Sequence, residues 1–100
     1  MIQARYGEDA YPIGRFILGR ATALGLSRTG LGRRLGYRDL GKAHQVLNTA
    51  LATGIVPSHM ARYLADALEV EERVLIAVIE ATGRQRGDEA RSNVSGYRAA

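Results

Sequence analysis

Apolar side chains recur at intervals of three and four residues along most of the chain, which is the spacing of one face of an α-helix. This pattern predicts five helices, over residues 12–24, 27–35, 39–53, 57–68 and 70–83. No stretch shows the alternation of apolar and polar residues that is typical of a half-exposed strand. We therefore expect an all-α fold.

Several of these helices begin and end at residues that favour helix termini. Pro12 suits a first helical turn, where a missing N–H costs no hydrogen bond. Ser27 and Asp39 are expected to cap the second and third helices, and Gly25 and Gly54 are expected to stop the first and third. Short helices with short connections indicate one compact domain.

The chain divides into three parts on this basis. Residues 1–11 are expected to form an N-terminal arm, residues 12–83 the helical domain, and residues 84–100 a flexible polar tail. The last part carries charged, glycine and serine residues and has little apolar surface to pack. A chain of 100 residues supplies a single core.

The chain contains no cysteine, which excludes disulfides and thiolate metal sites and agrees with a reducing compartment. No apolar run has the length of a signal peptide or of a membrane-spanning helix. We therefore expect a cytoplasmic protein that makes no contact with a membrane.

The charge of the chain is unevenly distributed. Residues 1–50 contain eight Arg or Lys and three Asp or Glu, whereas residues 51–83 contain two and five. The excess is concentrated in residues 25–42, GLSRTGLGRRLGYRDLGK, which carry five cations and one carboxylate. This distribution indicates one face for a polyanion, although the same arginines would also suit a merely solvated surface.

Two glycines four residues apart, Gly32 and Gly36, stand where a helix-turn-helix needs a small residue at its helix crossing and a glycine in its turn. With the leucines around them inward, GLSRTGLGRRLGY resembles the core of the lambda-repressor-like, or XRE-type, helix-turn-helix family. PSHMARYLADALEV is similar to the fourth-helix pattern of that family. The resemblance covers about residues 12–82. It implies a five-helix lambda-repressor-like helix-turn-helix domain that binds duplex DNA.

The third helix departs from the family pattern. Counted from Gly36, that pattern places buried apolar residues where this chain has Lys42 and Gln45, which do not belong in a small core. A turn one residue longer brings Ala43 and Val46 to those positions instead. We therefore expect Lys42 and Gln45 outside. Because the longer turn can tilt the helix, the family's base contacts do not transfer one by one.

The resemblance implies that the second helix of the motif, at about residues 39–53, enters the major groove. Gln45 would then address adenine and Lys42 guanine or a phosphate, and the other cations would hold the DNA backbone. The predicted DNA-binding residues are Arg28, Thr29, Arg33, Arg34, Arg38, Lys42, Gln45 and Thr49. Gln45 and Thr49 would equally suit a helix that serves a protein partner.

The fifth helix is apolar around much of its circumference, more than one small core can cover. Leftover apolar surface indicates a partner, and the family often pairs through this region. The predicted dimer interface is Ile76, Val78 and Ile79. The alternative is that the N-terminal segment covers this surface through Ile2, Tyr6 or Tyr11.

Together these features predict a sequence-specific, double-stranded-DNA-binding transcriptional regulator of bacterial or phage type, acting as a homodimer without a cofactor. The alternative is a helix-turn-helix fold used as a protein-binding module, antitoxin-like or a phage-encoded inhibitor. No enzyme is expected, because the hydroxyl groups sit at cap positions and no phosphate-binding loop is present. No metal is expected, since His44 and His59 lie fifteen residues apart without a third ligand.

Overall fold

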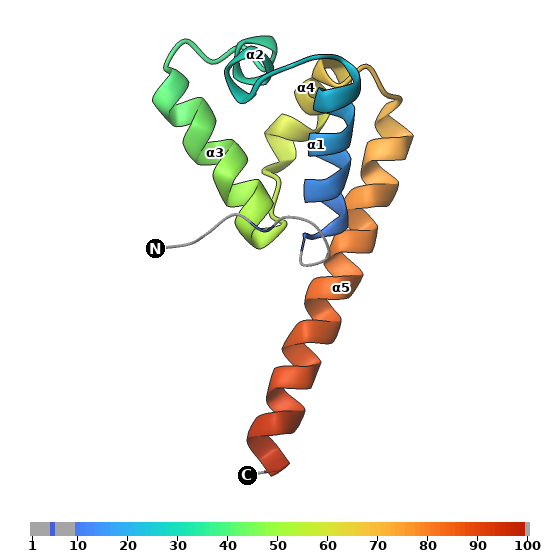
Figure 1. The fold of residues 1–100 in the computed structure, drawn as a ribbon. Helices are drawn as coiled ribbons and strands as arrows, with labels where there is room; N and C mark the ends of the chain where they lie inside the picture. Colours follow the sequence, from blue (N-terminus) through green and yellow to red (C-terminus); the bar gives the residue numbers. More distant parts are fainter. Residues whose placement is uncertain (1–4, 6–9, 100) are drawn as a thin grey trace.

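The computed structural model describes Arg5 and residues 10–99, and this part of the chain forms five helices and no strand (Figure 1). The helices are α1 (Pro12–Ala23), α2 (Arg28–Arg34), α3 (Leu40–Thr53), α4 (Ser58–Ala67) and α5 (Glu72–Ala99). The predicted all-α class is confirmed for these residues. The expected bounds of the first four helices agree with the observed ones to within one or two residues.

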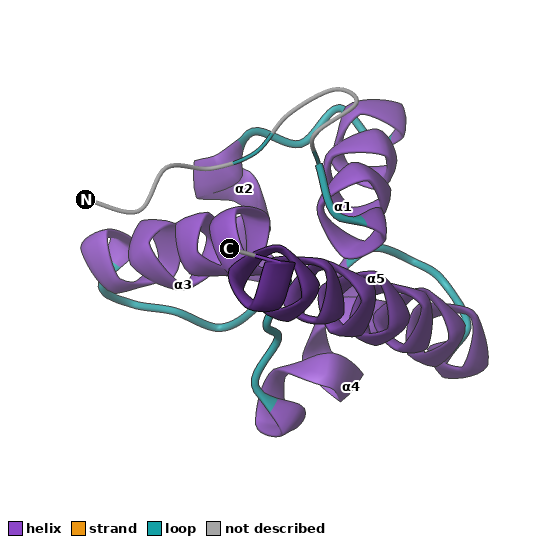
Figure 2. Ribbon diagram, turned by 90° about the horizontal axis from the view of Figure 1, so that it is seen from below, coloured by secondary structure: helices purple, strands orange, loops and turns teal. Residues whose placement is uncertain are grey.

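The helices surround a core between α1, α3, α4 and α5. α2 packs mainly on α3, whereas α5 packs on both α1 and α4. Figures 1 and 2 show α3 on one side of the molecule and the beginning of α5 on the other, with α1 between them. The second half of α5 extends beyond the other helices, and the longest dimension of the molecule is 48 Å.

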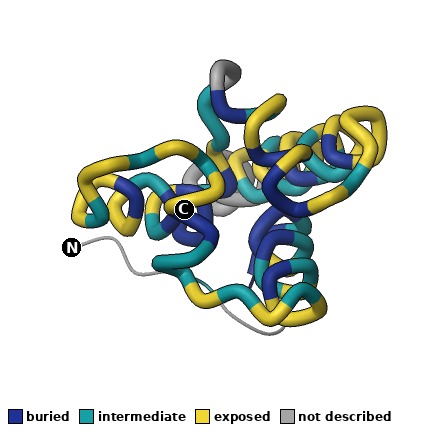
Figure 3. The backbone as a smooth tube through the Cα atoms, turned by 90° about the horizontal axis from the view of Figure 1, so that it is seen from above, coloured by how far each residue is buried: buried dark blue, intermediate teal, exposed yellow. Residues whose placement is uncertain are grey.

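The core contains the apolar residues that the periodicity places on one helical face. Every helix contributes buried positions, and Figure 3 marks the buried positions in dark blue along the backbone. Each large apolar side chain buried in this way stabilises the fold by about 1.5–3 kcal/mol. Those most completely buried are Ile13, Leu51, Leu64, Leu68 and Leu75.

The fifth helix is longer than the sequence pattern predicts, because residues 84–99, assigned to the polar tail, continue α5 as helix. Part of this segment is held from a distance. The Tyr11 hydroxyl donates a hydrogen bond of 2.9 Å to Oε2 of Glu89, and Nη1 of Arg5 lies 3.3 Å from Oε1 of the same carboxylate. Contacts from the beginning of the chain therefore support a stretch of α5 that has no apolar periodicity of its own.

The expected N-terminal arm is described only at Arg5, Ala10 and Tyr11, and Ile2 and Tyr6 lie outside the described residues. The Arg5 guanidinium lies 4.5 Å from the centre of the Tyr11 ring, and the Arg5 N–H donates to the Leu51 carbonyl at 3.2 Å. Ala10 and Tyr11 are buried. These residues join the end of α3 to the middle of α5.

The beginning of α1 is completed by a side chain from α5. No side chain of the preceding residue caps α1. Instead, the buried Thr82 hydroxyl accepts a hydrogen bond of 2.9 Å from the Ile13 N–H and donates one of 3.0 Å to the Val78 carbonyl. This bond ties α1 to α5. In the part of the chain that the structure describes, no helix has both the length and the apolar character needed to cross a membrane.

Candidate nucleic-acid interface

The crossing of α2 and α3 depends on the absence of a side chain at Gly32. A Cβ atom placed there would lie only 2.8 Å from Cβ of Ala43 on α3, too close for any real contact. The turn that follows contains Gly36 with a φ of 87°, a conformation that favours glycine. The Tyr37 N–H then donates to the Gly32 carbonyl at 3.2 Å. Both glycines have the roles predicted for them.

Side-chain caps define where α2 and α3 begin. The Ser27 hydroxyl accepts a hydrogen bond of 3.0 Å from the Gly30 N–H. Oδ1 of Asp39 accepts hydrogen bonds from the Gly41 and Lys42 N–H groups at 2.9 and 3.3 Å. Both predicted caps are confirmed, and each is worth about 1 kcal/mol. The single carboxylate of the basic segment is thus engaged at a helix terminus.

The exposed side of α3 carries the polar residues that the sequence placed there. Lys42, Gln45 and Thr49 are exposed, whereas Ala43 and Leu47 are buried. The Thr49 hydroxyl donates to the Gln45 carbonyl at 2.9 Å, which leaves its oxygen available as an acceptor. The inference of a longer turn, which moves Lys42 and Gln45 outward, agrees with this burial pattern.

Residues of α2 and of the turn extend this polar surface. Thr29 Oγ1 lies 3.3 Å from Nε2 of His44, so the first turn of α2 contacts α3. Arg33 is exposed and lies on the same flank of α2, four residues after Thr29. Arg38 is exposed in the turn, and Arg28 is partly exposed at the start of α2. We call Thr29, Arg33, Arg38, Lys42, Gln45 and Thr49 the α2–α3 face.

Arg34 does not belong to this face, because it is committed to the end of α4. Its Nη1 donates to the Ala67 carbonyl at 3.1 Å and lies 3.0 Å from Oε2 of Glu69. Arg20 of α1 reaches the same helix end and donates to the Leu68 carbonyl at 3.1 and 3.0 Å. The two guanidiniums thus satisfy carbonyls that α4 leaves without helical partners. The prediction that Arg34 contacts DNA is not supported by its position.

Two features of this region have no counterpart in the sequence interpretation. His44 was considered from the sequence only as a metal ligand, whereas its ring meets Thr29 across the α2–α3 crossing. An open hollow of about 230 Å³ also lies beside Gln45, lined by Gln45, Val46, Thr49, Ile55 and Pro57. No signal for the hollow was present in the sequence, because a single exposed apolar residue such as Ile55 is ordinary on a protein surface.

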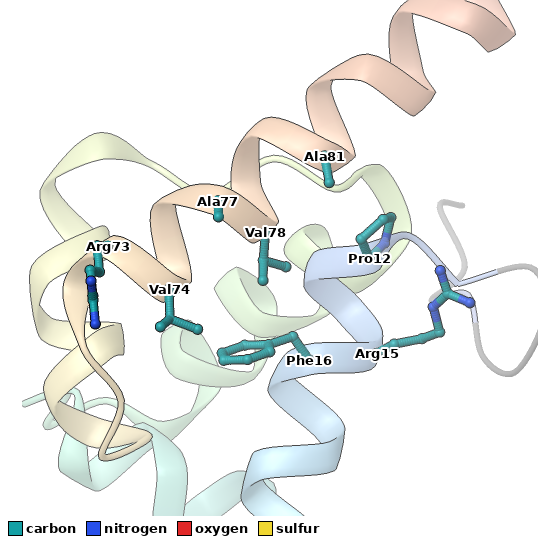
Figure 4. A pocket seen from close by; sticks show the side chains of 8 residues that line it. All are labelled: Pro12, Arg15, Phe16, Arg73, Val74, Ala77, Val78 and Ala81. Atoms are coloured by element: carbon teal, nitrogen blue, oxygen red, sulfur yellow. The ribbon is translucent and has the colours of Figure 1, made fainter.

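The residues predicted for a dimer interface do not share one open face. Ile76 is 43% exposed, whereas Val78 and Ile79 are partly buried against the core. Positions 76 and 78 point about 160° apart on a helix, and Val78 faces Phe16 of α1 (Figure 4). Tyr11 was one of the residues that could have covered the apolar surface of the fifth helix instead. It bonds to Glu89, which lies about 20 Å along α5 from Ile76.

The structure thus defines a small all-helical protein with one cationic face built on two crossing helices. No protein-family model, no curated protein and no solved structure matches the chain. The function of the α2–α3 face is therefore inferred from its geometry and charge.

Proposed function

We propose that the chain is a DNA-binding transcriptional regulator of bacterial or phage type, acting in the cytoplasm, whose α2 and α3 form a lambda-repressor-like helix-turn-helix. The carrying observation is the close crossing at Gly32, which leaves Lys42 and Gln45 exposed on α3 beside the exposed Arg33 and Arg38. A helix that shows polar side chains along its outer side fits the major groove of B-DNA. The acidic residues of α4 and α5 are not part of the α2–α3 face.

Five side chains of the α2–α3 face have distinct roles in this proposal. Lys42 and Gln45 occupy the first two turns of α3 and contact base edges, Gln45 suiting the donor and acceptor pattern of adenine. Arg33 and Arg38 are long cations at the rim of the face and contact phosphates. Thr29 positions the start of α2 against α3 through His44 and contributes a hydroxyl to the backbone contacts.

A homodimer would double this interface. The available surface is the flank of α5 that carries the exposed Ile76, together with the half of α5 that extends beyond the globule. A twofold pair through this flank would present two copies of α3 to successive turns of DNA, roughly 34 Å apart. Sedimentation equilibrium of the parent and of Ile76→Asp tests the pairing. A monomeric parent would contradict it.

A salt series tests the proposal that the ligand is DNA. Fluorescence anisotropy of a labelled duplex pool is measured against protein concentration at several salt concentrations. Each neutralised phosphate contributes about −0.9 to the slope of log K against log salt, so three or four phosphate contacts predict a slope near −3. An affinity that does not change with salt would contradict DNA binding.

Variants then locate the site. Lys42→Ala and Gln45→Ala are expected to weaken binding to a duplex selected from a random pool, and neither changes the melting temperature because both side chains are exposed. Arg62→Ala removes an exposed arginine of α4, outside the α2–α3 face, and serves as the control. If Arg62→Ala weakened binding as much as Lys42→Ala, the proposed face would be wrong.

A protein-binding module is the second candidate, and the hollow beside Gln45 is the observation that favours it. Val46, Ile55 and Pro57 give α3 an apolar border, which suits a protein side chain better than a phosphate. In this case Ile55→Ser would abolish a stable complex with a protein partner, whereas the salt series on DNA would show no binding. In the DNA-binding case Ile55→Ser leaves the salt slope unchanged.

A further inference from the structure

A second open surface lies between α1 and α5, away from α3 (Figures 1 and 4). It is a groove of about 750 Å³ that we call the α1–α5 groove. The two helices run antiparallel along it, since Ile13 near the start of α1 bonds to Thr82 of α5 while Arg20 at the end of α1 reaches Leu68 just before α5. Its described lining residues are Pro12, Arg15, Phe16, Arg73, Val74, Ala77, Val78 and Ala81.

The floor of this groove is apolar and incompletely covered. Val74 is 41% exposed, Ala77 is exposed, and Phe16 is only partly buried. Figure 4 shows Phe16 directed toward Val74 and Val78, so that the ring closes the bottom of the groove. A continuous apolar surface between two helices is the geometry that receives the apolar side of a third helix.

Both charged residues among those that line the groove are arginines. Arg15 is exposed and its side chain forms no hydrogen bond or ion pair with a described residue. Arg73 donates to Oε2 of Glu71 at 2.6 Å, but its side chain is 82% exposed and its other N–H groups remain available. Arg73 and Ala81 are eight residues apart, about 12 Å along α5. Arg15 follows Ile13, which bonds to Thr82, and so lies nearer the Ala81 end, with its side chain directed outward from α1 (Figure 4).

This charge pattern argues against a second copy of the chain as the occupant. A twofold interface places the same patch on both sides, so groove against groove would bring two arginines from each copy together, and the carboxylate beside them, Glu71, is already bonded to Arg73. The flank of α5 that carries Ile76, proposed above for dimerisation, lies about 160° around the helix from the groove residues Val74 and Val78.

We propose that the α1–α5 groove docks an acidic amphipathic helix of another protein. The apolar side of that helix covers Phe16, Val74 and Ala77, and two of its carboxylates, about two turns apart, bond to Arg15 and Arg73. This docking does not depend on the proposed DNA binding, because the α2–α3 face uses different helices. It would let the protein hold a partner while the α2–α3 face is occupied.

Two designed peptides test this docking. Both are fluorescein-labelled helices with leucines at positions i, i+3, i+4 and i+7, and they differ only in carrying glutamates or lysines at the two flanking positions. Anisotropy titration at low salt is expected to show binding of the glutamate peptide at least about fivefold tighter than the lysine peptide, since two exposed ion pairs supply a modest preference. Equal affinity of the two peptides would overturn the charge pairing.

Charge reversal makes the test specific to the groove. The double variant Arg15→Glu with Arg73→Glu is expected to reverse the preference, so that the lysine peptide binds tighter, and Val74→Asp is expected to weaken both peptides. Arg62→Glu, on α4, is the control and retains the preference of the parent. Circular dichroism melts confirm that each variant is folded, and Arg15→Gln replaces the double variant if that variant melts early.

Two outcomes would overturn the proposal. One is a loss of preference in Arg62→Glu equal to that in Arg15→Gln, which would mean that the peptides respond to overall charge. The other is a concentration-dependent self-association of the parent that Arg15→Glu abolishes, which would assign the groove to a second copy. DNA binding measured on the same variants separates this result from the proposed function, because neither Arg15 nor Arg73 belongs to the α2–α3 face.

Discussion

The α2–α3 face and the α1–α5 groove are both open to solvent, but the side chains that form the face are polar and charged, whereas those that form the floor of the groove are apolar. The first presents exposed cations and amides on helices whose termini are capped. The second presents an aromatic ring and aliphatic side chains between two arginines. Attraction by the first should weaken steeply with salt, whereas burial of apolar surface in the second should persist. The two proposed ligands should therefore respond differently to ionic strength.

The crossing that supports the α2–α3 face gives the largest expected effect. Gly32→Leu forces a side chain into the space where Ala43 lies, and overpacking of this kind costs about 3 kcal/mol, the upper end of the usual range. Urea unfolding followed by circular dichroism measures the loss. Gly19→Leu is the matched control, because nothing lies within 4 Å of a Cβ placed there on α1. It should stabilise the helix by about 0.5–1 kcal/mol, and an equal loss in both variants would contradict the close crossing.

The next largest loss of stability is expected at Thr82, which joins the two helices that form the α1–α5 groove. Thr82→Val keeps the shape of the buried side chain but leaves the Ile13 N–H without its acceptor, which costs about 1–3 kcal/mol. Thr22→Val, at an exposed position of α1, should change the stability by only a few tenths of a kcal/mol. If the two variants unfolded at the same urea concentration, Thr82 would not be what joins α1 to α5.

Local features of the fold were predictable from the sequence, because the residues that determine them are neighbours in the chain. Ser27 and Asp39 cap the helices that follow them directly, and Gly36 turns the chain immediately after α2. The exposure of Lys42 and Gln45 was also predictable, since a period of 3.6 residues places them opposite Leu47. These features account for most of the α2–α3 face.

The remaining features depend on contacts between distant segments. Nothing in the stretch after residue 83 indicates that Tyr11 bonds to Glu89, so the helical continuation of α5 was missed. The groove was missed because periodicity identifies Phe16 and Val74 as apolar without showing whether they fill the space between their helices. Arg33 and Arg34 are adjacent and identical in type, and only the packing of α4 separates their roles.

Arg33 and Arg34 should affect the stability and the DNA binding of the protein in opposite ways. Arg34→Ala should lower the stability by about 1 kcal/mol, because carbonyls at the end of α4 lose a charged donor, and it should leave the salt slope of DNA binding unchanged. Arg33→Ala should do the reverse, reducing the slope by about 0.9 while the urea midpoint remains that of the parent. Identical slopes for the two variants would show that Arg34 also reaches the DNA.

The smallest expected effect concerns the pH dependence of the contacts that hold α5. The hydrogen bond from Tyr11 lowers the pKa of Glu89, while burial and the same hydrogen bond raise the pKa of Tyr11. A carboxyl whose pKa is lowered by folding contributes stability above its unfolded pKa, about 4.3, and this contribution is lost as the pH falls through the folded pKa. For Tyr11, the contribution is present below the unfolded pKa of about 10 and is lost as the pH rises through the raised value.

Two variants separate the loss of stability at acid pH from the loss at alkaline pH. In Glu89→Gln, the urea midpoint should fall less steeply than in the parent between pH 5 and pH 3, because the carboxylate that favours folding is already absent. Tyr11→Phe should reduce the loss at alkaline pH in the same way. Glu80→Gln is the control, since Glu80 is exposed on α5 and forms no hydrogen bond or ion pair with a described residue. If Glu80→Gln reduced the fall of the urea midpoint between pH 5 and pH 3 as much as Glu89→Gln does, the hydrogen bond from the Tyr11 hydroxyl to Glu89 would not be what stabilises α5.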